Sequence, residues 1–109
     1  MEFDYAKIET YVSADGVDAV LAALSKSGAG HIAGSNYDSC CSTAEVTGHW
    51  RPLEGAEPHI GNIGELSSEP EVKIEATIAA GNIEETVAAV RAAHPYEEPV
   101  IYVIPLLVP

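Results

Sequence analysis

An internal repeat is the feature that most restricts how this chain can fold. The tripeptide Lys-Ile-Glu at residues 7–9 recurs at residues 73–75, and the same offset of 66 residues aligns Leu-Ala-Ala-Leu at 21–24 with Val-Ala-Ala-Val at 87–90. Apolar and polar residues alternate around both tripeptides, a pattern typical of a strand with one buried face. The tetrapeptides lie in segments with helical spacing. The repeat therefore predicts two strand-then-helix units, with strands at 6–12 and 72–78.

The two predicted helices each have one apolar face. Its members are Val17, Val20, Leu21 and Leu24 in the first helix, and Ile83, Val87 and Val90 in the second. Asp15 and Asn82 precede these residues and are the expected N-caps, because short polar side chains accept hydrogen bonds from the free N–H groups of a helix start. Gly28 and Gly30 are expected to end the first helix. Both apolar faces predict packing against a core.

Two further strands complete the predicted fold. Residues 36–47 follow the first helix, and residues 100–104 follow the second. The resulting order, β-α-β-β-α-β, is that of a ferredoxin-like split βαβ domain of class α+β, with an antiparallel sheet and both helices on one face. A chain of 109 residues with 47% hydrophobic residues is expected to form a single domain over residues 1–109.

Charge and composition exclude several classes of function. The chain has 17 Asp and Glu against 5 Lys and Arg, a formal net charge of −12 at pH 7. Such an acidic protein repels phosphate, so we expect no nucleic-acid partner. No apolar run approaches the ~20 residues of a membrane-spanning helix, and the acidic N-terminus does not resemble a signal peptide. We therefore expect a cytoplasmic protein with no membrane partner. The two cysteines are adjacent and cannot close a long loop, which fits a reducing compartment.

The segment 48–70 lies between the two halves and is rich in glycine and proline. It is too long for a tight hairpin turn, so we expect an arm, a lid or an oligomer contact. Trp50 in this segment, together with Tyr37 and Tyr96, is a candidate for lining a ligand pocket. Aromatic side chains beside such loops also form packing or interface contacts, and both interpretations stay open.

The second half ends in a polar corner, His-Pro-Tyr-Glu-Glu-Pro at residues 94–99. Pro95 disfavours helical geometry at His94, so the second helix should end there. An imidazole and the carboxylates of Glu97 and Glu98 are therefore gathered between a helix and a strand. One interpretation is a structural turn, in which a carboxylate pairs with His94 where the helix dipole favours a cation.

The other interpretation of this corner is a site for a metal ion or a small anion. His94 with Glu97 or Glu98 would supply two ligands, and Cys40 or His59 would complete the set. Imidazole, thiolate and carboxylate are ligands for zinc and related divalent transition metals. The sequence contains neither a CxxC nor an HxxxH spacing, so the identity of any cofactor is not predicted.

The adjacent cysteines carry a second expectation. In a regular strand Cys40 and Cys41 point to opposite faces, so one of them should be a core thiol. No catalytic motif surrounds either cysteine, and the phosphate-binding pattern GxxxxGK[ST] is absent. Neither nucleophilic catalysis nor a P-loop is therefore expected.

Four stretches of sequence in register along the chain resemble a known family. They are GAGHI at 28–32, NYDSC at 36–40, WRPLEGAEPHIG at 50–61 and HPYEEP at 94–99. Together they are similar to the PII-like, CutA-like domain inserted in bacterial Nif-three-like proteins, dinuclear-metal hexamers labelled GTP cyclohydrolase 1 type 2 homologues. The resemblance covers nearly the whole chain and implies a PII/CutA-like fold with a trimeric arrangement.

The chain also differs from those proteins. The flanking lobes that supply their dinuclear metal ligands are not in this sequence, so the resemblance does not imply hydrolase-like activity. Residues 33–37 read Ala-Gly-Ser-Asn-Tyr where the family usually has Gly-Asn-Tyr. Residues 100–103 are more apolar than the usual Ala-Tyr-Asp, and no polar role is implied for that strand.

We expect a homotrimeric, non-enzymatic binding or regulatory module of the PII/CutA type. Residues 100–108 are almost continuously apolar and would lie at a sheet edge, which a neighbouring subunit would cover. Two alternatives stay open. One is a metal-binding protein or metal-dependent enzyme that uses His94, Glu97 and Glu98, and the other is a structural trimerisation domain.

Overall fold

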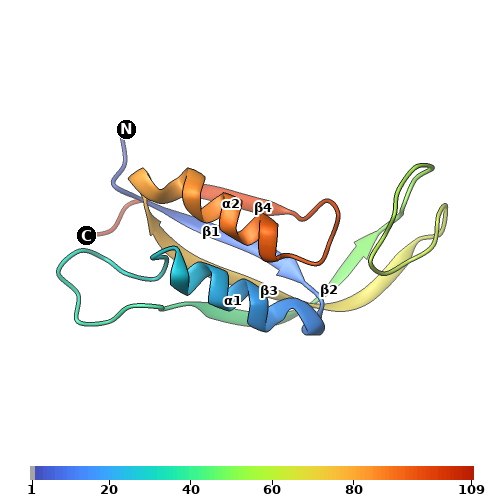
Figure 1. Ribbon diagram of the computed structural model, residues 1–109, viewed down its shortest axis with the longest axis horizontal. Helices are drawn as coiled ribbons and strands as arrows, with labels where there is room; N and C mark the ends of the chain where they lie inside the picture. Colours follow the sequence, from blue (N-terminus) through green and yellow to red (C-terminus); the bar gives the residue numbers. More distant parts are fainter. Residues whose placement is uncertain (1) are drawn as a thin grey trace.

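The computed structural model describes residues 2–109 and contains a four-stranded antiparallel sheet with two helices on one face (Figure 1). Its elements are β1 (Tyr5–Val12), α1 (Val17–Lys26), β2 (Ser42–Trp50), β3 (Ser67–Ala79), α2 (Ile83–Ala93) and β4 (Ile101–Leu106). Short 3-10 turns, η1 (Ala14–Gly16) and η2 (Ala80–Asn82), precede the two α-helices. The strand order is β2-β3-β1-β4, and the predicted fold class is confirmed.

The two halves of the internal repeat lie side by side in the sheet. β1 and β3 pair antiparallel, with Glu9 directly opposite Glu75. Lys7 Nζ lies 3.2 Å from Glu75 Oε2, and Lys73 Nζ lies 3.3 Å from Glu9 Oε2. Each repeat thus supplies the lysine for the other repeat's glutamate. These pairs offset the repulsion that two directly opposed carboxylates would otherwise cause.

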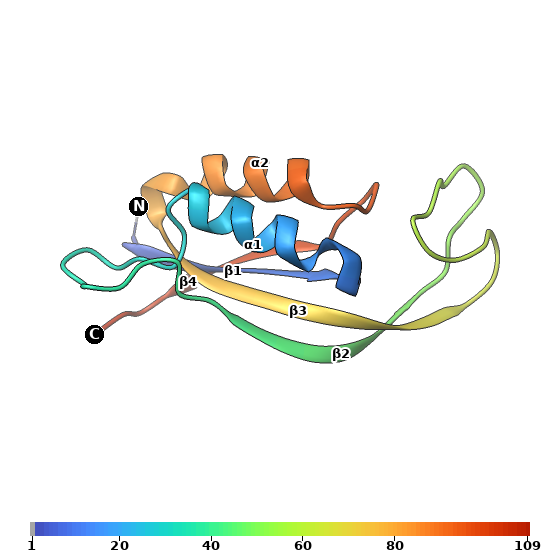
Figure 2. The same cartoon turned by 60° about the horizontal axis from the view of Figure 1, so that its bottom comes forward.

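The core lies between the sheet and the helices. Alternate residues of β1 and β3 point into it, among them Ile8, Ile74 and Ile78, which are at most 1% exposed. Val20 from α1 and Val90 from α2 close it from the other side. Figure 2 shows both helices over this face, while the described part of the chain leaves the opposite face of the sheet uncovered.

The second strand differs from the prediction. It was expected at 36–47, but β2 spans Ser42–Trp50. Residues 36–41 belong instead to a loop, 27–41, in which Ser39 has a positive φ of 56°. The Cys40 N–H donates to the Gly30 carbonyl, and the Gly30 N–H donates to the Thr77 carbonyl. These backbone bonds hold the segment next to β3 without extending the ladder.

The expected core thiol is also wrong. Cys40 and Cys41 are both free and exposed, because both lie in the loop that precedes β2 and not in a strand. The alternation argument required a strand at positions where the chain forms a loop. The two thiols are therefore accessible at one end of the molecule.

The helix ends agree with the sequence in part. α2 ends at Ala93, and His94 is extended with φ −75° and ψ 134°, as Pro95 predicts. Asn82 occupies the N-cap position of α2, although its side chain forms no capping hydrogen bond. Asp15 is not the N-cap of α1, since it lies in η1 and Gly16 holds that position. No helix within residues 2–109 is long and apolar enough to cross a membrane.

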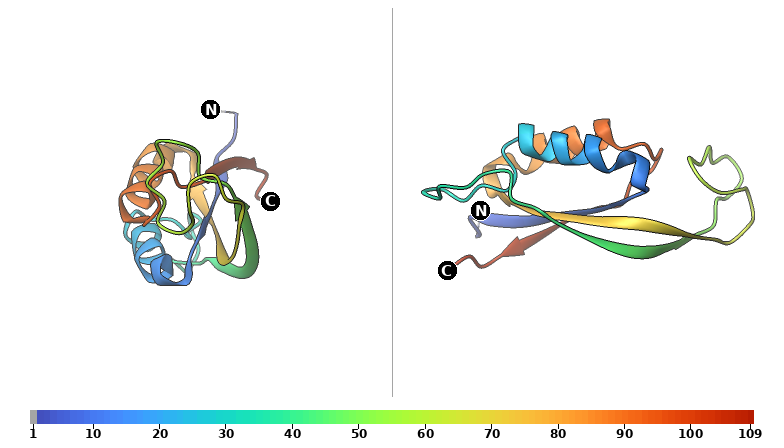
Figure 3. Two further views of the ribbon diagram at one scale, coloured as in Figure 1. Left: turned by 90° about the vertical axis from the view of Figure 1, so that its right-hand side faces the viewer. Right: turned by 90° about the horizontal axis from the view of Figure 1, so that it is seen from below.

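The predicted long arm is shorter than 48–70, because residues at both of its ends extend the β2–β3 ribbon. We use the name arm for residues 51–66, which connect β2 to β3. Figure 3 shows the loop 27–41 and the arm at opposite ends of the molecule. The ribbon and the arm contribute to an elongated shape of 48 × 25 × 22 Å.

Candidate functional site

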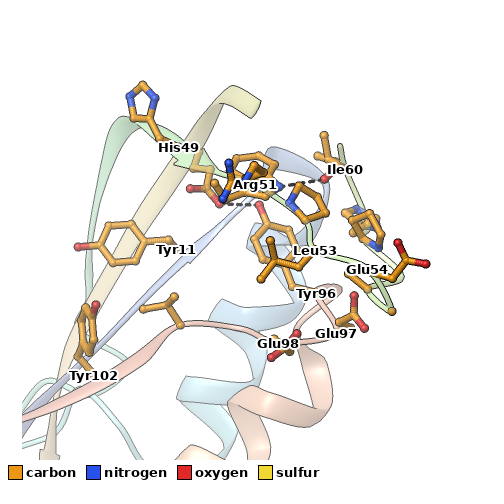
Figure 4. A pocket seen from close by; sticks show the side chains of 18 residues that line it. Tyr11, His49, Arg51, Leu53, Glu54, Ile60, Tyr96, Glu97, Glu98 and Tyr102 are labelled. Carbon is orange, nitrogen blue, oxygen red and sulfur yellow. Dashed lines mark hydrogen bonds between the residues drawn. The ribbon is translucent and has the colours of Figure 1, made fainter. Parts of the chain in front are cut away.

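A cleft of about 760 Å³ lies where the arm approaches the corner 94–99 and the neighbouring ends of β1 and β4 (Figure 4). Its lining includes several aromatic side chains and several carboxylates. The aromatic residues are Tyr11, Trp50, Tyr96 and Tyr102, and the carboxylates are Glu54, Glu71, Glu97 and Glu98. His49, Arg51 and His59 also line it, with Leu53, Ile60 and Val100 among the apolar residues. Its volume is in the range of small-molecule sites.

Trp50 anchors the base of the arm. It is the last residue of β2, and its Nε1–H donates to the Ile60 carbonyl at 3.2 Å. Gly61 follows with φ 110°, and a Cβ there would lie only 2.7 Å from Ser67 Oγ. The absence of a side chain at Gly61 therefore lets the arm fold back against the indole.

Glu71 and Tyr96 form the polar centre of the site. The Tyr96 hydroxyl donates to Glu71 Oε2 at 2.6 Å, and Glu71 is only 9% exposed. Burial, followed by the hydrogen bond to Glu71, raises the pKa of Tyr96 to about 12. A Cβ at Gly48 would overlap with Glu71 Oε1. Because Gly48 has no side chain, β2 leaves space there for the buried carboxylate of Glu71.

His94 joins the corner to the end of β1. Its Nε2–H donates to the Tyr11 carbonyl at 2.8 Å, and its Nδ1 accepts the Tyr96 N–H at 3.1 Å. These two partners assign the neutral tautomer with the proton on Nε2. Burial lowers the pKa of His94, which is 7% exposed. The ring packs edge-on against Tyr96, with centroids 4.6 Å apart.

Two exposed contacts hold the arm against the rest of the molecule. The Glu57 N–H donates to Glu97 Oε2 at 2.6 Å, and His59 Nε2 lies 2.9 Å from Asp15 Oδ2. The hydrogen bond from the Ser13 hydroxyl, and then that from His59, lower the pKa of Asp15. The arm is therefore closed over the cleft by side chains of the corner and of η1.

The structure separates the predicted site residues into two groups. His94, Glu97, Glu98 and His59 lie at the cleft end, together with Trp50 and Tyr96. Tyr37 and Cys40 belong to the loop 27–41 at the opposite end, where Tyr37 is 75% exposed. Cys40 is thus not positioned to complete a ligand set with His94.

The predicted ion pair between His94 and a corner carboxylate is absent among the described residues. Both ring nitrogens of His94 contact backbone groups, and Glu97 binds the arm instead. Within residues 2–109, no three His, Cys, Asp or Glu side chains are grouped so as to hold a metal ion. This geometry favours the structural turn over the metal site.

Sequence reasoning missed Glu71, Tyr11 and Asp15. Glu71 could have been found from the sequence, because it stands on the polar side of the alternating β3 pattern, directly after the glycine- and proline-rich segment 48–70. The roles of Tyr11 and Asp15 could not, because each meets its partner across more than 40 residues of sequence.

Comparisons with known proteins agree with this geometry. No family model matches the chain. A protein of Listeria innocua named GTP cyclohydrolase 1 type 2 homolog is 43% identical over 102 residues, which is 94% of this chain and 27% of that protein. The crystal structure of a Bacillus cereus protein related to NIF3 superposes with a TM-score of 0.81 and 36% identity, over 95% of this chain and 26% of the other. The predicted resemblance is confirmed.

The PII/CutA-like fold is confirmed by more distant structures. CutA1 from Shewanella sp. SIB1 superposes with a TM-score of 0.68 at 16% identity, over 97% of this chain and 84% of the other. At that identity the similarity establishes the fold alone. The chain spans about a quarter of the length of the Listeria innocua protein and of the Bacillus cereus protein. The activity of those whole proteins is therefore not assigned to this chain by the comparison.

Proposed function

We propose that this domain forms a homotrimer and acts as a non-enzymatic binding or regulatory module, with the cleft as its binding site. The observation that carries the proposal is the uncovered face of the sheet. Tyr102 and Ile104 of β4 lie on this face and are 53% and 39% exposed. Exposed apolar side chains on a sheet face with an unpaired edge strand are typical of a surface that another subunit covers.

The charges on this face support its burial against further copies of the chain. Lys7 and Lys73 balance Glu9 and Glu75 there, with N–O distances of 3.2 to 3.7 Å. The four charges of these residues thus cancel one another in a chain whose net charge is −12. Copies of an acidic protein repel one another least through such a region.

The cleft supports binding rather than catalysis. Its central groups, Tyr96 and Glu71, are bonded to each other, and Glu97 is bonded to the arm. These bonds give the groups a positioning role. We propose that any cyclohydrolase activity indicated by the names of the relatives resides in segments of those proteins other than the one that this chain matches. The exposed free thiols Cys40 and Cys41 support a reducing compartment such as the cytoplasm.

Native mass spectrometry at micromolar concentration tests the assembly. We expect the mass of three chains, and a monomer that persists at every salt concentration would contradict the proposal. Ala44 and Ala88 make a matched pair, since both are exposed, but Ala44 lies in register with Lys73 on the open face and Ala88 lies on α2. Ala44→Glu should dissociate the trimer, whereas Ala88→Glu should leave it intact.

Trp50 offers a second test of the assembly. We predict that the arm also contacts a neighbouring subunit and that Trp50→Ala weakens association by about 2 kcal/mol, the usual cost of truncating a buried interface tryptophan. Sedimentation velocity measures the change. If the variant sediments as the parent does, Trp50 acts only within its own subunit, where its Nε1–H donates to the Ile60 carbonyl.

The metal-site alternative stays a prediction with less support, because a metal at either nitrogen of His94 would displace a backbone hydrogen bond. Isothermal titration of metal-stripped protein with zinc, copper and manganese decides it. A heat of metal binding that is measured with the parent protein and is lost in His94→Ala would favour the metal site. A trimer whose cleft binds no probe would instead favour the structural trimerisation domain.

A further inference from the structure

We propose that the cleft binds an organic cation, a primary amine attached to a flat aromatic group. This inference rests on the proposed binding function and names the chemistry of its ligand. It combines three features of one cleft: its excess of carboxylates, the burial of one of them, and its aromatic walls.

The charged groups in the lining favour a positive ligand. Four carboxylates line the cleft, whereas the fixed positive charges in the lining are limited to the guanidinium of Arg51. Figure 4 shows Glu97 and Glu98 on the corner and Glu54 on the arm, so the carboxylates come from both sides. A phosphate or carboxylate ligand would meet repulsion from each of them.

Glu71 is the anchor that distinguishes this cleft from an ordinary acidic surface. Its side chain is about nine-tenths buried, with 9% exposed, and it lines the cleft. A carboxylate can accept about four hydrogen bonds, but among the described residues only the Tyr96 hydroxyl donates to it. A ligand ammonium carries three N–H donors and a charge, and would bond the acceptor positions of Glu71 that Tyr96 leaves free.

The aromatic walls select an amine that carries a flat group. Figure 4 shows Tyr11 on one side of the site and Tyr96 with Leu53 on the other. Trp50 lies at the base of the arm. Aromatic faces attract both a cation and an aromatic ring. Simple metal ions gain little from such walls, so an aromatic amine fits the cleft better than a bare ion does.

The experiment uses three probes that share a phenyl ring and differ in charge: 2-phenylethylammonium, 2-phenylethanol and phenylacetate. Isothermal titration calorimetry measures affinity, and the fluorescence of Trp50, the single tryptophan of the chain, reports occupancy of the cleft. We expect the ammonium to bind about ten-fold or more tightly than the alcohol, as a charge-assisted hydrogen bond predicts. Phenylacetate should bind more weakly than either.

Charge-neutral variants separate the site from the general acidity of the protein. Glu71→Gln should lower the affinity for 2-phenylethylammonium about ten-fold, while the circular-dichroism spectrum stays the same. Glu84→Gln, at an exposed position on α2, removes the same charge and should change affinity less than two-fold, a bound set by general screening. If Glu71→Gln does not fold, Glu98→Gln, which is exposed in the cleft lining, replaces it with a several-fold loss expected.

Several results would overturn the inference. Equal binding of ammonium and alcohol would assign the cleft to neutral apolar ligands, and an equal loss in Glu84→Gln would assign binding to overall charge. Zinc binding that depends on Glu71, with none for the amine, would make it a metal site. A trimer that binds none of the three probes rejects the amine and leaves the assembly standing, whereas a monomer rejects the proposed function.

Discussion

The loop 27–41, which connects α1 to β2, and the arm, which connects β2 to β3, lie at opposite ends of the molecule and are held in different ways. The loop is tied by backbone bonds, of which the bond from the Gly30 N–H to the Thr77 carbonyl is 2.7 Å long. The contacts of the arm with the corner and η1 use side chains, such as Glu97 with the Glu57 N–H and His59 with Asp15. The tie between the loop and β3 is thus made by backbone groups, whereas the ties of the arm to the corner and η1 involve titratable side chains.

This difference indicates which connection can respond to its surroundings. Backbone bonds between neutral groups change little with pH or salt. Exposed contacts between charged groups weaken as the salt concentration rises and depend on which partners are protonated. The candidate cleft lies under the responsive connection, and the free cysteines lie in the other. A ligand that binds the carboxylates of the cleft would therefore act on the part of the molecule that is easiest to rearrange.

The largest effect is expected at Gly30. Its φ is 82°, and a Cβ there would overlap with the backbone of Cys40, so Gly30→Ala should destabilise the protein by about 2 kcal/mol or more. Gly34, with φ 86° and nothing within 4 Å of an added Cβ, is the control. Gly34→Ala should cost about 1 kcal/mol. Urea denaturation measures both, and equal costs would show that the backbone ties of the loop are unimportant.

His94→Ala should have the next largest effect, about 1–3 kcal/mol, because it leaves the Tyr11 carbonyl and the Tyr96 N–H without their partner. The matched control is His31→Ala in the loop, where the ring is exposed and, among the described residues, bonds the Tyr37 carbonyl alone. It should cost a few tenths of a kcal/mol, at the low end for an exposed hydrogen bond. Similar costs would mean that His94 does not hold the corner.

The pKa of His94 also predicts a pH dependence. Burial holds that pKa below its ordinary 6.5, so the unfolded chain takes up the proton more readily than the folded one. Stability should be at its full value above pH 6.5 and fall as pH drops through the lowered pKa. His94→Gln should flatten this part of the profile. An unchanged profile in the variant would contradict the assignment.

Tyr96 predicts a loss of stability at the alkaline end. Its pKa is raised from 10.0 to about 12, so its contribution is complete below pH 10 and disappears as pH rises towards 12. Tyr96→Phe should remove this pH dependence. The difference in absorbance at about 295 nm between parent and variant follows the phenol, a standard phenolate signal given its pKa near 10 in model peptides. A difference that titrates near pH 10 would contradict the buried bond to Glu71.

The smallest effect is expected at the contact between the arm and η1. Asp15→Asn removes the charge paired with His59, and hydrogen exchange of the arm amides should become faster, more so at low salt. Because the pKa of Asp15 is lowered, the parent should keep this protection until pH falls through that lowered pKa. Asp38→Asn, an exposed carboxylate in the loop 27–41, is the control and should leave the arm unchanged.

Much of the fold could be predicted from the sequence, because its signals are local and repeated. Alternation around Ile8 and Ile74 located β1 and β3, and Pro95 located the end of α2. The strand predicted at 36–47 begins later, at Ser42, because Gly30 and Ser39 adopt positive φ values in a loop that is tied to Thr77 of the distant strand β3. Local patterns do not reveal a loop stabilised by a distant strand.

The candidate site was only half predictable. His94, Glu97, Trp50 and Tyr96 were identified as candidates from composition and position, and they do lie at one end of the molecule. Which of them contact one another was not predictable, since the partner of Tyr96 is Glu71, 25 residues away in the chain. Cys40 was wrongly expected to complete a ligand set with His94 for the same reason. The local sequence does not show at which end of the sheet a loop lies.

Periodic burial and proline geometry act over a few residues, so local patterns along the chain are enough to predict the class of fold. Which of the titratable residues contact one another depends on how the strands and loops pack in three dimensions. The order β2-β3-β1-β4 brings the end of β1, the start of β3, the corner and the arm to one end of the sheet. Burial there requires Glu71 and His94 to find hydrogen-bond partners, and those partners come from distant segments that packing alone brings within reach.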